Sequence, residues 1–277
     1  MAIITISRGS FSGGKMLAEQ LGRRLECPCI DRDALVRRAA TGRVSEWDLR
    51  AALEQPPDFP GAFNHRRYTY LALIQAALAE QVRTGRAVYH GLAGHLLLKG
   101  APGLMRVRLI APFEFRIAMA RQRLNLSRNE AIGHIEAMDR DRRRWTQFLY
   151  GVDWGDPAQY DVVINLEQLS VEQACRLIVS AIEPGGLEFS VERRAALYDF
   201  AMASRVRAEL ARDLETLNLE VEVECRGGSI SIRCDSGGEE AESIRRVVSA
   251  IPGVTEVTLQ EMLEPQRPGK NVPTGGE

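Results

Sequence analysis

A glycine-rich segment near the start of the chain carries residues suited to binding phosphate. It runs from Gly9 to Lys15 and fits the pattern G-x-x-x-x-G-K, directly after an apolar strand-like run and directly before a helical pattern. Glycines let successive backbone N–H groups curl around phosphate oxygens, the helix N-terminus adds partial positive charge, and the lysine reaches the outer phosphates. The residues that we expect to bind a polyphosphate are Gly9, Ser10, Ser12, Gly13, Gly14, Lys15 and Met16.

Met16 bears on the metal ion that usually accompanies a bound triphosphate. Many phosphate loops have at this position a Ser or Thr whose hydroxyl binds magnesium. Magnesium would therefore need ligands from elsewhere in this chain, or mostly from water and phosphates. The alternative for the whole segment is a glycine-rich turn that only packs a helix on a strand. The strand, loop and helix context favours phosphate binding.

A second group of cationic side chains lies within residues 113–145. Ser127 and Glu130 form a capping-box pattern, which predicts that a new helix starts there after a break at residues 124–126. Two helices joined in this way form a hairpin arm, and planar guanidinium groups on it can bind phosphoryl oxygens bidentately. The alternative is a solvated helix in which neighbouring aspartates balance some of the arginines. The arginines are Arg116, Arg121, Arg123, Arg128, Arg140, Arg142, Arg143 and Arg144.

Strand-like runs and helical patterns alternate around these residues. Leu17, Leu21 and Leu25 repeat every four residues, and apolar residues within 71–82 repeat at spacings of three and four, so each set forms one stripe on a helix. Strands that alternate with helices predict a parallel sheet with helices on both faces, an α/β fold. The strand-like runs are Ala2–Ile6, Cys29–Asp31, Ala87–His90, Arg106–Ile110 and Asp161–Leu166.

The pattern changes after Glu183-Pro184-Gly185-Gly186, where helix breakers follow a helix and the charge balance turns from basic to acidic. We predict a first domain over residues 1–182 and a linker over residues 183–197. A small α+β domain with the order α-β-β-α-β follows over residues 198–263. The tail over residues 264–277 is rich in Pro, Gly and polar residues, and we expect it to be disordered.

Gly227-Gly228 predicts a two-residue hairpin loop inside the small domain. The register that this loop imposes places the apolar side chains of both strands on one face. Cys225 and Cys234 do not face each other in this register, so we expect no disulfide between them. The predicted pairs are Cys225 with Ile230, Val223 with Ile232, and Val221 with Cys234.

Composition narrows the class of protein. The chain has 277 residues, of which 45% are hydrophobic and 26% are charged, as in ordinary globular proteins, and its net charge is −1. No apolar stretch is long enough to span a membrane and no secretory signal is visible, so we expect a cytoplasmic protein. The five cysteines show no metal-ligand spacing, and we expect no metal site built by the protein. The acidic second domain is poorly suited to nucleic acid.

Five short segments within residues 1–182 follow one another in an order typical of one family. They are Ile4–Arg8, Ile30–Leu35, Ala111–Ile117, Asp139–Arg142 and Tyr160–Asn165. Together they resemble the cytidylate kinase-like family of P-loop nucleoside monophosphate kinases. The resemblance implies a five-stranded parallel core, a lid, and transfer of the γ-phosphoryl group from ATP, with Mg²⁺, to a nucleoside monophosphate such as CMP or dCMP.

The resemblance also implies roles for individual residues. Lys15 and the loop amides hold the donor phosphates, and Arg142, with Arg140 as a companion, acts from the lid during phosphoryl transfer. Asp31 and Arg37 fall where the acceptor-binding region begins. Positioning and charge stabilisation then supply the rate, because phosphoryl transfer asks little covalent chemistry of the protein.

Two further acceptor-binding residues follow from the resemblance, together with one departure from it. Asp161 falls near the base or ribose. Relatives have a Gly-Arg pair after the third strand-like run, and its arginine holds the acceptor phosphate, whereas this chain has Gly91-Leu92. His90 is the residue that can substitute for this arginine, although a histidine at a strand end can also be purely structural.

The second domain, residues 198–263, resembles a BON domain. We expect it to bind a protein or a small ligand as its partner. The alternative to an enzyme is a catalytically weak nucleotide sensor, in which the first domain binds a nucleotide and the second reports its state. Leu92 and Met16 favour the sensor, whereas Lys15 and the arginine-rich arm favour the enzyme.

Overall fold

The first part of the chain folds around a five-stranded parallel sheet. The computed structural model describes residues 2–40, 44–54, 65–91, 93–182, 190–235 and 237–261. The strand order is β2-β3-β1-β4-β5, and every neighbouring pair is parallel. The predicted strands are confirmed, with small changes at their ends. They are β1 (Ile3–Arg8), β2 (Cys29–Asp31), β3 (Ala87–His90), β4 (Leu104–Ile110) and β5 (Val162–Asn165).

Helices cover both faces of this sheet, as predicted. On one face, α1 (Gly14–Arg24) and α8 (Val171–Ile182) pack against Ile4 and Ile6 of β1. On the other face, the four helices between β2 and β4 contribute to a second core with Ile3 and Tyr89. Both cores are apolar because parallel strands are buried on both sides. The four helices are α2 (Arg32–Ala39), α3 (Glu46–Glu54), α4 (His65–Val82) and α5 (Gly94–Leu97).

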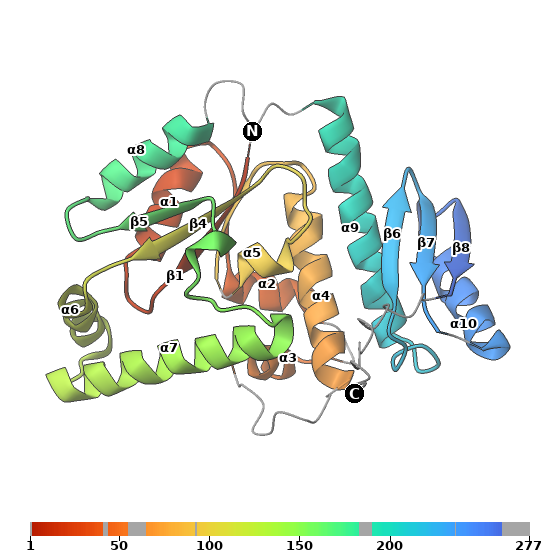
Figure 1. The fold of residues 1–277 in the computed structure, drawn as a ribbon, viewed down its shortest axis with the longest axis horizontal. Helices are drawn as coiled ribbons and strands as arrows, with labels where there is room; N and C mark the ends of the chain where they lie inside the picture. Colours follow the sequence, from red (N-terminus) through yellow and green to blue (C-terminus); the bar gives the residue numbers. More distant parts are fainter. Residues whose placement is uncertain are drawn as a thin grey trace, which may run out of the picture.

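The predicted hairpin arm is present. It consists of α6 (Phe113–Leu124) and α7 (Arg128–Tyr150), which run past the carboxyl end of β1 (Figure 1). The turn between them places Asn125 in the left-handed region, and α7 begins with the predicted capping box between Ser127 and Glu130. The two helices bury a small core of their own, against which Phe11 of the glycine-rich loop packs. The arm is therefore attached to the loop by apolar contact.

The second part of the chain forms a three-stranded sheet in the order β6-β7-β8. β6 and β7 are antiparallel, β8 runs parallel to β7, and both glycines of the hairpin loop have positive φ. The register pairs Cys225 with Ile230 and Val223 with Ile232, as predicted, whereas Val221 precedes the paired strand. All five cysteines are free thiols, as expected for Cys225 and Cys234. The elements are β6 (Glu222–Arg226), β7 (Ser229–Arg233), α10 (Gly238–Ser249) and β8 (Glu256–Gln260).

The helix that joins the two parts is longer than predicted. α9 spans Val191–Arg212, so residues 191–197, expected in the linker, are helical. Ser190 explains this start, because its side chain accepts a hydrogen bond from the Arg193 N–H and caps the helix. Residues 183–189 of the linker and the tail over residues 264–277 lie outside the described residues.

α9 contributes to two cores. Leu197 and Ala208 are buried in the core that contains α4. Val206 and Leu210 are buried in the core of the three-stranded sheet. Figure 1 shows α9 standing between α4 and β6. Among the helices of the described ranges, none combines the length and the apolar character needed to cross a membrane.

Candidate active site

The glycine-rich loop connects β1 to α1 in the predicted way. Gly13 is the N-cap of α1 with φ 86°, a conformation that residues with a side chain rarely adopt. The Ser12 hydroxyl donates to the Gly9 carbonyl at 2.9 Å, and the Ser12 N–H donates to the same carbonyl at 3.3 Å. This turn curls the backbone at the amino end of α1, where N–H groups lack helical partners. The loop can therefore bind an anion.

Lys15 lies in the first turn of α1, next to this loop. Its side chain is 58% exposed, and its ammonium is 3.8 Å from a carboxylate oxygen of Glu19. A surface ion pair of this kind holds a side chain only weakly. Lys15 is therefore able to leave Glu19 and reach a phosphate bound on the loop.

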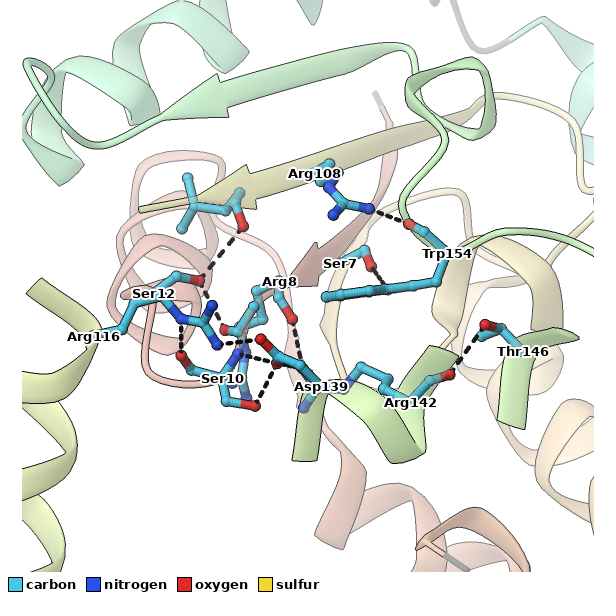
Figure 2. A network of polar contacts seen from close by, with 12 residues as sticks. Ser7, Arg8, Ser10, Ser12, Arg108, Arg116, Asp139, Arg142, Thr146 and Trp154 are labelled. Carbon is cyan, nitrogen blue, oxygen red and sulfur yellow. Dashed lines mark hydrogen bonds and ion pairs between the residues drawn. The ribbon is translucent and has the colours of Figure 1, made fainter. Parts of the chain in front are cut away.

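The arm contacts the loop through Asp139 of α7. The Asp139 carboxylate accepts hydrogen bonds from the Ser10 N–H at 3.3 Å and from the Ser10 hydroxyl at 3.1 Å. Arg116 of α6 donates to the Ser10 carbonyl at 2.7 Å and to Asp139 at 2.5 Å (Figure 2). Arg116 is one of the arginines expected on the arm, and its ion pair with Asp139 is of the kind that the solvated-helix alternative described, whereas the contact of Asp139 with the loop was not predicted. The Asp139 carboxylate thus accepts from a backbone N–H of the glycine-rich loop that could otherwise donate to a phosphate.

Arg142 is brought to the loop, whereas Arg140 is not. The Arg142 guanidinium donates to the Arg8 carbonyl, the last one before the loop, at 2.8 Å (Figure 2). Burial, and next the charge of Arg8, lower the Arg142 pKa to about 10. Arg140 is exposed on α7, because two steps along a helix turn the side chain by roughly 200°. Of the two predicted lid arginines, only Arg142 faces the loop.

An aromatic wall stands behind Arg142. The Trp154 ring centre is 5.4 Å from the Arg142 guanidinium carbon, and its indole N–H donates to the buried Ser7 hydroxyl at 2.7 Å. The Tyr160 hydroxyl donates to the Trp154 carbonyl at 3.0 Å. These aromatic residues were not among those predicted from the sequence. Its signal is a pair of aromatic residues in the short polar segment between α7 and β5.

His95 of α5 packs against this wall. Its ring centre is 4.8 Å from that of Tyr160, and both ring nitrogens are buried without a hydrogen-bond partner. Burial, and then the charges of Arg106 and Arg108, lower the pKa of His95 to about 4. His95 is thus an uncharged residue of the core.

The predicted acceptor residues Asp31 and His90 lie side by side, at the carboxyl ends of β2 and β3. The Asp31 side chain caps α2 by accepting from the Ala34 N–H at 2.6 Å. His90 is buried with its Nδ1 atom unpaired, and burial together with the charge of Arg8 lowers its pKa. Arg37 is exposed on α2. Leu92 lies outside the described residues.

Asp161 is not near this edge of the sheet. It precedes β5 and accepts hydrogen bonds from Arg106, from the backbone N–H at 2.8 Å and from the guanidinium at 2.6 Å. Arg106 pairs with Thr5, four residues before the loop begins at Gly9, which corresponds to about 13 Å along the strand. Asp161 therefore lies toward the opposite end of the strands, where it forms an ion pair that ties β5 to β4.

The residues around the loop do not fit a magnesium site built by the protein. Met16 supplies no oxygen at the position where a hydroxyl would be needed, and the Ser12 hydroxyl already donates to Gly9. Within the described ranges, no group of three His, Cys, Asp or Glu side chains could hold a metal ion.

The fold and the site define a class of protein. A parallel sheet in the order β2-β3-β1-β4-β5, a G-x-x-x-x-G-K loop after its central strand and an arginine-bearing arm are the features of a P-loop kinase. Residues 3–168 match the cytidylate kinase-like family, and the chain belongs to that family. The family implies ATP and other nucleotides as ligands.

Individual relatives agree with this assignment. A cytidylate kinase of Pyrococcus horikoshii is 28% identical over 182 residues, which cover 65% of this chain and 88% of that protein. An uncharacterised protein of Eubacterium ventriosum has a structure with a TM-score of 0.50 and 19% identity, covering 66% of this chain and 98% of that one. This second likeness shows the fold alone. The resemblance of residues 198–263 to a BON domain remains a prediction.

Proposed function

We propose that the protein transfers a phosphoryl group from ATP to a nucleoside monophosphate, with CMP or dCMP as the acceptor. The family membership and the similarity to a cytidylate kinase support this function. The observation that carries it is the position of Arg142, which α7 holds at 2.8 Å from the last carbonyl before the glycine loop. A buried guanidinium at the mouth of a phosphate loop is suited to neutralise charge on a transferring phosphoryl group.

In this proposal the donor lies on the loop that follows β1, and the acceptor lies at the carboxyl ends of β2 and β3. The loop amides and Lys15 hold the β- and γ-phosphates of ATP, and Asp31, Arg37 and His90 surround the acceptor. The bond between the γ-phosphorus and the β–γ bridging oxygen breaks while a phosphate oxygen of the acceptor forms the new bond. Arg142 stabilises the oxygens that gain charge in between. Asp161 is left out of the site because of its position.

ATP would bring Mg²⁺ on its own phosphates, with water as the remaining ligands. This arrangement agrees with Met16 at the loop and with the preference of Mg²⁺ for few protein ligands.

A coupled assay for ADP release over all ribo- and deoxynucleoside monophosphates tests the proposal. We expect one or a few acceptors to accelerate ADP release at least tenfold above the rate with ATP alone. Mass spectrometry of the accepted nucleotide should show a gain of one phosphoryl group. If ATP binds and no acceptor accelerates its turnover, the enzyme proposal fails.

That last outcome would favour a second candidate, a nucleotide sensor. Asp139 already occupies the Ser10 N–H, so the arm is held on the loop by a carboxylate. ATP would displace this carboxylate, and the change would pass to a protein or small-ligand partner of the C-terminal part. An ATP-dependent increase in proteolysis of α7 without turnover is the result expected of a sensor.

A further inference from the structure

Arg8 was not assigned a role above, although it lies at the centre of the candidate site (Figure 2). It is the last residue of β1, and its carbonyl accepts the hydrogen bond from Arg142. Its side chain runs along Gly14, the first residue of α1, so closely that a Cβ atom there would collide with the Arg8 Cδ atom. Gly14 therefore keeps space for the Arg8 side chain beside the phosphate loop.

The Arg8 guanidinium has no anionic partner within the described residues. Its Nε atom is buried and makes no hydrogen bond. Asp139, the carboxylate that contacts the loop, is already bound by Arg116 at 2.5 Å and lies 3.7 Å from Arg142. Arg8 as a whole is half-buried, and a charge that is partly buried without a partner costs free energy that a ligand of opposite charge can offset.

The neighbours of Arg8 make this imbalance larger. Burial, and then the charges of Arg123 and Arg32, lower the pKa of Arg8, while Tyr89 acts in the opposite sense. The charge of Arg8 in turn lowers the pKa values of Arg142 and His90. These effects place the Arg8 guanidinium within electrostatic reach of the arm on one side and of the acceptor edge on the other. Positive charge thus accumulates between the loop and the end of β3.

We propose that Arg8 is a further catalytic residue, whose guanidinium binds the phosphoryl group in transit between a donor on the glycine loop and an acceptor at the ends of β2 and β3. This inference rests on the proposed phosphoryl transfer and adds a residue to it. Arg8 donates N–H hydrogen bonds to non-bridging oxygens of that group and neither gains nor loses a proton. The planar fork of an arginine suits two such oxygens at once.

The side chain itself can be tested with Arg8→Met and Arg8→Ala. Arg8→Met keeps the aliphatic stem along Gly14 and removes the charge. We expect the thermal unfolding midpoint of the ligand-free Arg8→Met variant to rise, because a partly buried charge without a partner has been removed, whereas a structural role predicts a lower midpoint. We expect kcat to fall 100- to 1000-fold in both variants, the usual effect of removing one donor to a transition-state oxyanion.

Chemical rescue and anion binding complete the test. Millimolar guanidinium chloride should raise the kcat of Arg8→Ala at least tenfold and leave the kcat of the wild type unchanged. Calorimetry with inorganic pyrophosphate should show affinity at least tenfold weaker in Arg8→Ala than in the wild type. Arg205→Ala, at an exposed position on α9, is the matched control. Its kcat and its affinity for pyrophosphate should equal those of the wild type.

The possible failures are distinct. If the wild type turns over no acceptor but binds pyrophosphate in an Arg8-dependent way, the proposed function fails and the anion site at Arg8 stands. If the wild type and Arg8→Ala bind pyrophosphate equally, or neither binds it, the inference about Arg8 is overturned. A kcat of Arg8→Ala within fivefold of the wild type also overturns it.

Discussion

Replacing Lys15 with Ala should separate nucleotide binding from stability. The Lys15 and Glu19 side chains are 58% and 44% exposed and 3.8 Å apart, so their ion pair contributes at most about 0.5 kcal/mol to the free energy of unfolding. Hydrogen bonds from an ammonium to a phosphate contribute roughly 1.5–3 kcal/mol. At about 1.4 kcal/mol for each factor of ten, ATP affinity should fall roughly 10- to 150-fold.

Isothermal titration calorimetry with ATP, together with urea denaturation, measures both quantities on the same preparations. Lys99→Ala is the matched control, since Lys99 is an exposed lysine that follows α5. It should leave both the ATP affinity and the unfolding free energy unchanged. An unchanged ATP affinity in Lys15→Ala would refute the assignment of the loop as the phosphate site. A loss of stability above about 1 kcal/mol would show that Lys15 has a structural role.

Three further predictions concern the residues around the loop. As the pH falls from about 6.5 to about 4, the unfolded chain binds a proton at His95 that the folded chain does not, so the free energy of unfolding should fall by up to about 3 kcal/mol. His95→Leu should remove this share of the pH dependence in urea titrations at pH 7 and pH 4.5. Trp154→Phe should lower the unfolding free energy by about 1–2 kcal/mol, because the buried Ser7 hydroxyl loses the 2.7 Å hydrogen bond from the indole. An unchanged urea midpoint would contradict this role of Trp154. Phe11→Gly is compatible with the backbone at φ 62° but removes the ring that packs on the arm. Trypsin should therefore cleave the arginine-rich arm several-fold faster in this variant. Equal cleavage rates would show that Phe11 does not hold the arm.

Local patterns were sufficient to predict the fold. Most of the parallel strands are short runs rich in apolar residues, and the capping box at Ser127 marks the start of α7 correctly. The glycine pair at residues 227–228 sets the register of β6 and β7, because a two-residue hairpin loop leaves only one pairing that keeps apolar side chains on one face. These features depend on neighbours in sequence.

The site is built from residues that lie far apart in the sequence, and contacts between such residues were predicted less completely than the strands and helices. Choosing Arg142 over Arg140 requires knowing which side of α7 faces the loop. The ion pair of Asp161 with Arg106 requires the register between β4 and β5. The contact of Asp139 with Ser10 joins residues 129 positions apart, and no sequence pattern in either segment predicts it.

The two buried sides of α9 have a consequence for how the two parts of the chain communicate. A helix that fills two cores cannot slide or tilt without opening one of them, because packed interiors tolerate little displacement. A displacement of α4 would therefore press on α9 and, through it, on the core of the small sheet. Ending a recombinant fragment at residue 182 would strip α4 of the partner that covers it, so the boundary useful for expression lies after the small sheet rather than before it.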